Sequence, residues 1–264
     1  MMLDLHCHIL PGVDDGAVDL PDALELARDA LATGVRAVFA TSHLWEKLFD
    51  TSPEHNYAEW KHLVRELKRA DIPLEVFPGA ENYLASDVSA AEFAKKAVPL
   101  GENGKHVLFD FSLRQMPPHV GDAVDALARR GLTAVIAHPE RNADLQRDPR
   151  PVADWIARGA LIQINAPSLV GIHGEAPAAA AADLLERGAG HLLASDAHHR
   201  RRRPFCLDRG REIAARIVGA EEAKLMCEDR PWAIARGEDV DVPRDVNLES
   251  RARGARFLRK LFDS

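Results

Sequence analysis

Two histidines near the amino terminus are spaced for metal binding. His6 and His8 lie in the segment DLHCHIL, where residues 2–6 are predicted to form a β-strand. Alternate residues of a strand share a face, so the two imidazoles project together and Cys7 points away as a packed thiol. Such a pair at the carboxyl end of a strand is a common way to hold a divalent ion. The alternative is a pair of partly exposed histidines before a turn.

The loop that follows brings two adjacent carboxylates close to these histidines. Its sequence PGVDDG favours a turn and contains Asp14 and Asp15. One aspartate would bind metal while the other stabilises the turn, and the spacing does not choose between them. The alternative is that both only stabilise the turn.

Histidine or acidic residues recur at the ends of most other predicted strands. If the strands are parallel, their carboxyl ends open onto one rim, where these side chains would meet. Buried acids are costly unless they are paired or bound to metal. Taken singly, each residue has an ordinary alternative as a cap, a turn former or a hydrogen-bonded polar group. The residues are His43, Glu81, Asp110, His138, Asp196 and His198.

Together these positions supply five imidazoles and four carboxylates, counting one of the paired aspartates of the loop. That number is sufficient for two or three metal ions with bridging carboxylates. The mixed nitrogen and oxygen donors favour Mn, Fe or Zn over Ca.

Two arginines are candidates for phosphate binding. Arg141 lies three residues after His138 and Arg203 five residues after His198, so both can face the same rim. A guanidinium offers a planar fork to phosphate oxygens, which metal ions also bind. The alternative for the run of arginines at 200–203 is a solvated basic loop. The other histidines are expected at the surface or in the core: His55, His62, His106, His119, His173, His191 and His199.

Other phosphate chemistries lack their motifs. A cysteine-based phosphatase needs an arginine six residues after its cysteine. Here the residues six positions after the three cysteines are Val13, Glu212 and Ala233. There is no GxxxxGK[ST] loop and no dinucleotide-binding fingerprint after the first strand. Metal-assisted hydrolysis remains.

Short apolar runs alternate with longer helical patterns, which predicts parallel strands covered by helices. Seven strands suggest a barrel or a strongly curved open sheet, with a doubly wound sheet as the alternative. The predicted strands are 2–6, 36–41, 74–80, 106–111, 133–137, 160–165 and 191–195. The predicted helices are 20–33, 53–70, 88–96, 120–130, 151–158 and 175–187.

No linker or repeat divides the chain, so a single domain over 1–264 is expected. After Pro204 the pattern is helical to the end, and residues 251–260 are basic and amphipathic. The basic tail from about residue 250 is expected to be a solvated helix that closes the barrel. The alternative is a segment that docks on a membrane or a partner.

Composition limits the remaining classes. The chain has 264 residues with a net charge of −7, which argues against a nucleic-acid partner. Three cysteines without a C-x-x-C pair suit a reducing compartment. No signal peptide and no membrane span are evident. A cytoplasmic protein is expected, with peripheral membrane association left open.

The motifs HCHILPGVDDG, TSH, GAE, AHPER and SDAH, in this order, resemble those of the PHP (polymerase and histidinol phosphatase) superfamily. More narrowly, they resemble the bacterial manganese-dependent tyrosine phosphatases of the CpsB/CapC type from capsule and exopolysaccharide loci. The resemblance extends from Met1 to about Trp232. It implies an α/β fold, a distorted (β/α)7 TIM-like barrel of the PHP type, with a trinuclear metal centre.

The resemblance also implies roles for matching residues. One ion would be held by His6, His8, Glu81 and Asp196. A second would be held by Glu81, Asp110 and His138, and a third by Asp15, His43 and His198. It favours Asp15 over Asp14, and Mn²⁺ over Fe, Zn, Co or Mg.

Two positions depart from familiar members of the group. Asp110 stands where they have glutamate, and its shorter side chain would weaken or reposition one metal. The loop after His43 reads LWEKL, which is more apolar and less positive than in some relatives. Trp45 would either stack on a tyrosyl ring or simply pack.

The expected function is a metal-dependent phosphomonoesterase in which water attacks phosphorus in line. Arg141 and Arg203 would stabilise the equatorial oxygens, and His43 or Asp196 would deliver a proton to the leaving oxygen. The expected partner is a phosphorylated tyrosine kinase or another phosphotyrosyl protein. The alternatives are a small-molecule phosphatase, such as one for histidinol phosphate, a metal-dependent deaminase or amidohydrolase, and a non-catalytic metal-binding regulatory module.

Overall fold

The computed structural model describes residues 1–45, 47–102 and 104–249. Within these residues, nine short strands, all parallel to their neighbours, form two sheets with the orders β1-β2-β4 and β3-β5-β6-β7-β8-β9. The strands are β1 (Met2–Cys7), β2 (Val35–Ala40), β3 (His43–Leu44), β4 (Glu75–Pro78), β5 (Glu81–Tyr83), β6 (His106–Asp110), β7 (Thr133–Ala137), β8 (Leu161–Asn165) and β9 (Leu192–Ala194).

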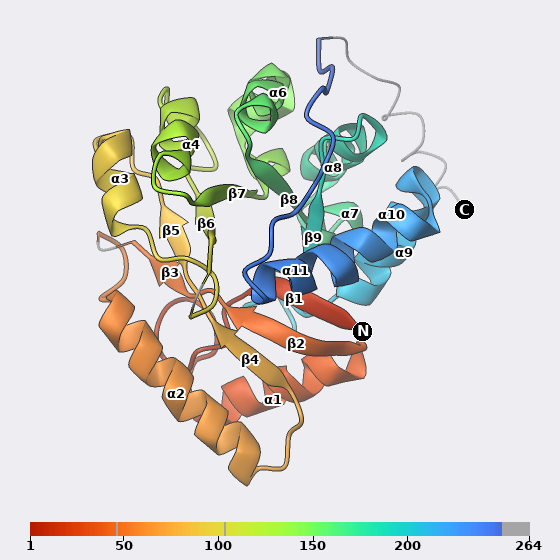
Figure 1. Ribbon diagram of the computed structural model, residues 1–264. Coiled ribbons are helices and arrows are strands. Elements are labelled where there is room, and N and C mark those ends of the chain that lie inside the picture. The colour runs from red at the N-terminus through yellow and green to blue at the C-terminus, as the bar shows by residue number, and fades with distance from the viewer. Residues whose placement is uncertain (46, 103, 250–264) are drawn as a thin grey trace.

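Helices connect the strands and lie outside them (Figure 1). The helices before the last strand are α1 (Leu20–Ala32), α2 (Pro53–Arg69), α3 (Ala90–Lys96), α4 (Val120–Ala128), the 3₁₀ turn η1 (Pro139–Arg141), α5 (Ala143–Arg147), α6 (Arg150–Ala157), α7 (Ala166–Leu169) and α8 (Glu175–Glu186). After β9 come α9 (Leu207–Val218), α10 (Ala220–Lys224), the π-helical turn η2 (Leu225–Asp229) and α11 (Arg230–Ala235). The α/β class and the parallel strands predicted from the sequence are confirmed.

Local signals explain several helix starts. Asp19, Ser52 and Ser89 precede α1, α2 and α3, and the side chain of each accepts a backbone N–H from the first turn. Proline follows directly in the first turn of α1 and α2, where its missing N–H costs nothing. The helices therefore begin close to the predicted positions.

Two of the seven predicted strands are each followed by a short strand that was not predicted. The predicted strand 36–41 corresponds to β2 and is followed by β3, and the predicted strand 74–80 corresponds to β4 and is followed by β5. The breaks lie at Thr41–Ser42 and Gly79–Ala80, and there the chain passes from the first sheet to the second. At Gly79 an added Cβ atom would lie 2.9 Å from Cδ2 of the buried Leu100, so a larger residue at this crossing would require the Leu100 side chain to shift.

The two sheets also approach each other at β1 and β9. Cys7 forms a parallel bridge with Ala197, and the amide of His8 donates to the carbonyl of Ala197 at 2.8 Å. The amide of Asp196 likewise donates to the carbonyl of His6 at 2.8 Å. The first and last strands are thus neighbours at their carboxyl ends.

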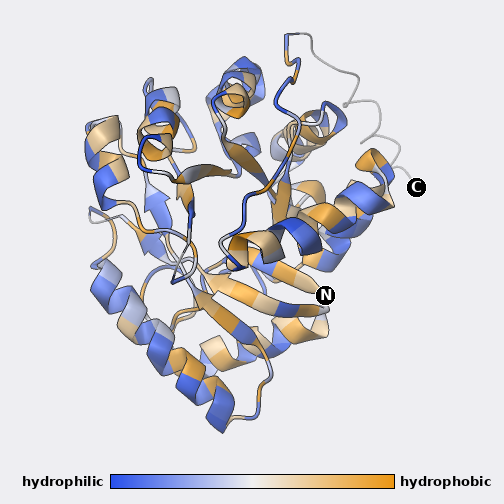
Figure 2. Cartoon of the chain, in the orientation of Figure 1, coloured by the Kyte–Doolittle hydropathy of each residue, from blue (hydrophilic) through white to orange (hydrophobic). Residues whose placement is uncertain are grey.

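The strands are buried on both faces. In β6, Val107 and Phe109 join the cluster packed against the helices, whereas Leu108 joins a second cluster that includes Ile234 of α11. Figure 2 shows strands that are largely hydrophobic and helices that alternate hydrophobic and hydrophilic bands, while β5 is hydrophilic. The exception is informative because β5 contains Glu81 and Asn82.

The region after Pro204 differs partly from its prediction. Helices continue only to Ala235, and residues 238–248 form neither helix nor strand. Val242 and Leu248 are nevertheless buried, and Arg244 Nη1 donates to the carbonyl of Ala160 at 2.9 Å, so side-chain contacts hold this segment. The predicted basic tail at 251–260 lies outside the described residues. Within the described part of the chain, every helix is too short or too polar to cross a membrane.

Candidate metal centre

The carboxyl end of β1 carries the first two candidate ligands. His6 and His8 are fully buried, and their Nε2 atoms lie 3.2 Å apart. The pairing of β1 with β2 is irregular between Asp4 and Cys7, the stretch of the strand that contains His6. The Cys7 thiol points the other way, to the carbonyl of Phe39. The two imidazoles therefore project together, as the sequence predicts.

The short strands β3 and β5 place the next two candidates side by side. His43 and Glu81 are register partners, and His43 Nδ1 lies 3.0 Å from Glu81 Oε2. Glu81 is also 3.4 Å from the Nε2 atoms of both His6 and His8. Glu81 is consequently the carboxylate shared by most of the histidines.

Two candidates sit on strained backbone directly after a strand. His138 follows β7 with φ 34°, and Asp196 lies just beyond β9 with φ 49°. A non-glycine residue in this left-handed region costs free energy, of order 1–3 kcal/mol, and persists only where the surroundings fix it. Both side chains are turned into the rim, where His138 Nε2 lies 2.9 Å from Glu81 Oε1.

All nine predicted ligands come together in four overlapping groups. Within each group, the donor atoms lie within 4.8 Å of one another. Asp110 belongs to one of these groups despite its short side chain. The groups are His8, Asp15, His43 and His198; His6, His8 and Glu81; His6, His138 and Asp196; and Glu81, Asp110 and His138.

The centre contains buried polar atoms that lack hydrogen bonds. Within the described residues, no hydrogen bond of regular geometry is found for Glu81 Oε2, Asp110 Oδ1, Asp196 Oδ1, His43 Nδ1 and His198 Nε2, although His43 Nδ1 and His198 Nε2 each lie close to a carboxylate oxygen. Unpaired oxygens are expensive to bury, and a cation between them removes that cost. Burial, followed by the negative charge of Glu81, raises the pKa of Asp110 well above its usual range. The donor set therefore fits divalent ions.

The structure separates the two aspartates of the PGVDDG loop. Asp14 Oδ2 accepts from His8 Nδ1 at 2.7 Å and from the His43 amide at 2.9 Å, so Asp14 orients His8. Asp15 Oδ1 instead lies 3.2 Å from His198 Nε2 and 3.5 Å from His43 Nε2. Asp15 is the one positioned as a ligand.

Three positioning residues escaped the sequence analysis. Gln163 Oε1 lies 3.0 Å from His6 Nδ1, and Gln163 Nε2 donates to Asn165 Oδ1 at 2.7 Å. Asn165 Nδ2 in turn donates to Asp196 Oδ2 at 2.7 Å. Asp4 accepts the Ser195 amide and ties β1 to the end of β9. The signal was present, because Gln163 and Asn165 interrupt the apolar run LIQIN of β8.

The two predicted arginines converge on one carboxylate. Arg141 and Arg203 donate to Asp196 Oδ2 at 2.8 and 2.7 Å. The neighbouring Arg201 and Arg202 are exposed, and Arg200 pairs with Asp29 of α1. Only Arg203 of the basic run turns towards the centre.

The centre opens into a cavity of about 360 Å³, here called the site cavity. Both arginines line it together with apolar and aromatic side chains. Phe49 stacks on His43 with ring centroids 5.1 Å apart, and Trp45 stacks on Tyr83 at 3.8 Å. The aromatic and exposed apolar lining residues are Trp45, Leu48, Phe49, Tyr83, Phe111 and Leu113.

The remaining histidines lie outside the four groups. His55 is exposed, His106 and His191 are buried, and His62, His119, His173 and His199 are partly buried. This distribution agrees with their expected surface and core positions.

A parallel α/β fold with this rim of imidazoles and carboxylates defines a protein of the PHP type. The profile of the family described as "Capsular polysaccharide synthesis, CpsB/CapC" matches residues 2–236. The chain belongs to this CpsB/CapC family.

Individual relatives agree with this assignment. The chain is 33% identical over 228 residues to the tyrosine-protein phosphatase YwqE of Bacillus subtilis (strain 168), covering 86% of this chain and 89% of that one. It is 31% identical over 239 residues to the tyrosine-protein phosphatase CpsB of Streptococcus pneumoniae, covering 88% and 98%.

Solved structures extend the comparison. A structure described as one of YwqE and CpsB, "unique metal-dependent tyrosine phosphatases", superposes with a TM-score of 0.87 at 30% identity, covering 94% of this chain and 100% of that one. An organophosphorus hydrolase from Deinococcus radiodurans superposes with a TM-score of 0.57 at 16% identity, covering 89% and 92%, and shares the fold alone.

Proposed function

We propose that this chain is a metal-dependent protein-tyrosine phosphatase. The observation that carries the proposal is the convergence of nine donor side chains beside two arginines and an aromatic cavity. Membership of the CpsB/CapC family supports it, since the relatives at 33% and 31% identity are named tyrosine-protein phosphatases.

Two or three divalent ions would be held by His6, His8, Asp15, His43, Glu81, Asp110, His138, Asp196 and His198. We propose Mn²⁺, with Fe, Zn, Co or Mg as alternatives, because the mixed nitrogen and oxygen donors include no thiolate. Such ions supply Lewis-acid polarisation of phosphate oxygens and lower the pKa of water.

The chain's own residues bind and orient the phosphate ester. Arg141 and Arg203 reach the site cavity from the segments that follow β7 and β9, and their guanidinium groups would hold the non-bridging oxygens. The aromatic and apolar walls exclude water and suit a phenyl ring. A phosphotyrosyl side chain combines both features.

Of the two candidate proton donors, His43 is the better placed. Asp196 is 1% exposed, and its Oδ2 atom already accepts from Arg141, Arg203 and Asn165. The His43 side chain is 14% exposed and faces the site cavity. We propose that, with two ions bound and the group of His8, Asp15, His43 and His198 free of metal, His43 passes a proton to the leaving phenolate, which needs less help than an alkoxide would.

The physiological partner we propose is a phosphorylated tyrosine kinase of a polysaccharide locus, or another phosphotyrosyl protein, in the cytoplasm. The family description, capsular polysaccharide synthesis, supports this assignment. Three unpaired cysteines are compatible with that compartment. We also propose that the chain acts as a single domain, because the candidate site draws residues from His6 through Arg203.

Parallel assays test the activity. The protein, stripped with a chelator and reloaded with Mn²⁺, is assayed on a phosphotyrosyl peptide and on histidinol phosphate. We expect metal-restored hydrolysis of the peptide, with little of histidinol phosphate. His138→Ala should abolish turnover of the peptide, because it removes a donor shared with Glu81 and Asp110. Full metal-dependent activity in His138→Ala would mean that the site is misplaced. Inactivity of the wild-type protein after reloading with Mn²⁺, Fe, Zn, Co or Mg would support a regulatory module.

A further inference from the structure

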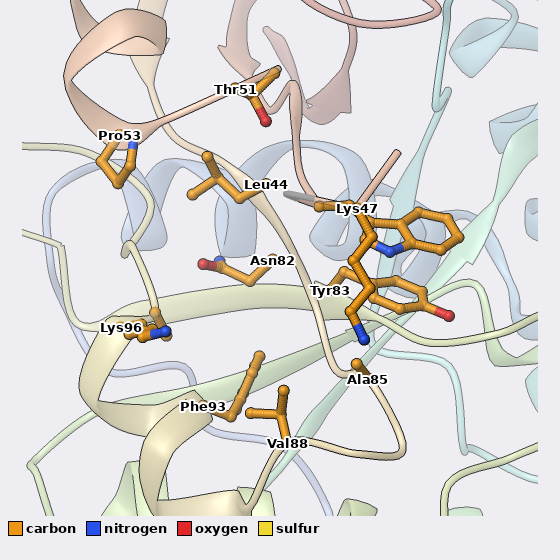
Figure 3. A pocket seen from close by; sticks show the side chains of 12 residues that line it. Leu44, Lys47, Thr51, Pro53, Asn82, Tyr83, Ala85, Val88, Phe93 and Lys96 are labelled. Atoms are coloured by element: carbon orange, nitrogen blue, oxygen red, sulfur yellow. The ribbon is translucent and has the colours of Figure 1, made fainter. Parts of the chain in front are cut away.

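A second cavity adjoins the site cavity on the other face of β3 and β5 (Figure 3). It has a volume of about 330 Å³ and is called here the flanking pocket, with Leu44, Lys47, Thr51, Val88, Phe93 and Lys96 in its lining. Its position follows from strand alternation. His43 and Glu81 line the site cavity, and their next neighbours Leu44 and Asn82 line the flanking pocket.

The two cavities share one wall. Trp45 and Tyr83 line both, and their rings stack in parallel with centroids 3.8 Å apart. A peptide whose phosphotyrosine occupied the site cavity would need to cross only this aromatic pair to reach the flanking pocket. Adjacent cavities with a shared wall are suited to one extended ligand.

The lining specifies what this pocket would accept. Leu44, Val88 and Phe93 supply an apolar surface, and Lys47 and Lys96 stand at opposite sides of it (Figure 3). No acidic side chain is among the residues described as lining the pocket. The chemistry therefore favours an apolar side chain beside a carboxylate.

A buried hydroxyl adds an independent indication. Thr51 is 8% exposed and lines the pocket, and its Oγ1 atom finds no hydrogen-bond partner within the described residues. A buried hydroxyl normally has a partner, which a peptide carbonyl or a carboxylate would provide. Thr51 lies at the edge of the pocket near Leu44 (Figure 3).

The lysines are available despite their present partners. Lys47 pairs with Asp87 at 2.5 Å and Lys96 with Glu92 at 3.3 Å, and all four side chains are more than half exposed. Exposed pairs of this kind contribute only about 0–1 kcal/mol, so an incoming carboxylate exchanges with them at small cost.

We propose that the flanking pocket binds the peptide segment next to phosphotyrosine and selects an apolar residue adjacent to an acidic one. This inference rests on the proposed phosphatase function and adds a substrate preference to it. Contacts in this pocket would raise kcat/KM for a peptide with the matching flank. They would not affect kcat/KM for phenyl phosphate, which has no flanking residues.

The test compares phosphotyrosyl peptides that differ only in the flank. Peptides with Leu-Glu, Leu-Lys, Ser-Glu or Ser-Ser, on either side of phosphotyrosine, are assayed with phenyl phosphate as the small substrate. The variants are Lys96→Glu and the matched control Lys95→Glu, which makes the same charge change on the neighbouring exposed residue of α3, outside the pocket lining.

We expect wild type to prefer Leu-Glu in one of the two orientations. Lys96→Glu should lower kcat/KM for that peptide about tenfold more than it lowers kcat/KM for phenyl phosphate, because charge reversal replaces attraction with repulsion. Lys95→Glu should change kcat/KM for the peptide and for phenyl phosphate by the same factor.

Several results would overturn the inference while leaving the phosphatase function intact. One is equal hydrolysis of all flanks, and another is identical behaviour of Lys96→Glu and Lys95→Glu. A third is a non-competitive effect of unphosphorylated Leu-Glu peptide on phenyl phosphate turnover, which would make the pocket an effector site. If no phosphate ester is hydrolysed by any of the proteins with Mn²⁺, the proposed function itself fails.

Discussion

At the scale of single residues, the centre depends on groups that orient the ligands as much as on the ligands. Asp14 and Gln163 hold the Nδ1 atoms of His8 and His6, which leaves both Nε2 atoms facing the centre. Hydrogen bonds of this kind fix the tautomer and the ring orientation of a ligand. The bond of Gln163 to His6 could not be predicted from motif spacing, because the two residues lie 157 positions apart.

The arginines permit a direct residue-scale prediction. Arg141→Ala should lower kcat/KM for a phosphotyrosyl peptide by about 10- to 100-fold, since a hydrogen bond to a charged group contributes about 1.5–3 kcal/mol. Asp196 would keep its bonds from Arg203 and Asn165, so metal content should change little.

Steady-state kinetics and metal analysis check this expectation. Arg202→Ala is the matched control, because it removes an exposed arginine of the run at 200–203 that does not line the site cavity. Equal kcat/KM values for Arg141→Ala and wild type would show that Arg141 does not contact the phosphate.

At the scale of elements, the sequence predicts more about the strands than about their interruptions. Apolar runs and terminal glycines correctly indicate seven strand positions and six helices. The breaks before β3 and β5 could not be predicted because they arise where the chain crosses between sheets. The short helices α5 and α7 were also missed, since neither spans two turns of periodic pattern.

Packing between the PGVDDG loop and β1 yields an element-scale prediction. A Cβ atom on Gly16 would lie 2.1 Å from the His8 carbonyl oxygen and 2.6 Å from His8 Cβ. Gly16→Ala must therefore displace the loop or His8, and we expect a loss of stability of about 1–3 kcal/mol together with weaker metal binding.

Denaturant unfolding and metal titration measure these effects. Gly121→Ala is a suitable control, because Gly121 lies in α4 and its added Cβ would meet first the flexible side chain of Arg158. That variant should be neutral or slightly more stable. If Gly16→Ala matched Gly121→Ala in both measurements, the close approach of the loop would be irrelevant.

At the scale of the whole molecule, parallel topology explains why scattered motifs meet. Eight of the nine candidate ligands lie at the carboxyl end of β1, β2, β4, β6, β7 or β9 or within four residues beyond it, and those ends share one rim. Asp15 reaches the same rim from the longer loop after β1. The clustering could therefore be predicted from sequence, given the parallel class. The flanking pocket could not, because its lining comes from the opposite face of the same strands and from α3.

Buried histidines away from the centre give a whole-molecule pH prediction. Burial lowers the pKa of His106 from its usual 6.5 to about 4, and neither ring nitrogen has a partner within the described residues. The unfolded chain takes up this proton near pH 6.5, but the folded chain does so only near pH 4. Stability should therefore fall as the pH drops through this window.

Between pH 7.5 and 5.5, His106 should account for a loss of about 1 kcal/mol in the free energy of unfolding. Denaturant unfolding of metal-free wild type and His106→Leu at both values isolates this contribution from that of the other titrating groups. Equal losses of unfolding free energy in the two proteins would show that His106 takes up its proton as readily in the folded chain as in the unfolded chain.

We propose that nine side chains hold two or three divalent ions at one rim. The decisive measurement is anomalous diffraction at the manganese edge from crystals grown with Mn²⁺. We expect two or three anomalous peaks bounded by the four ligand groups, with Glu81 touching more than one. Manganese peaks only elsewhere in an active, Mn²⁺-loaded protein would contradict it.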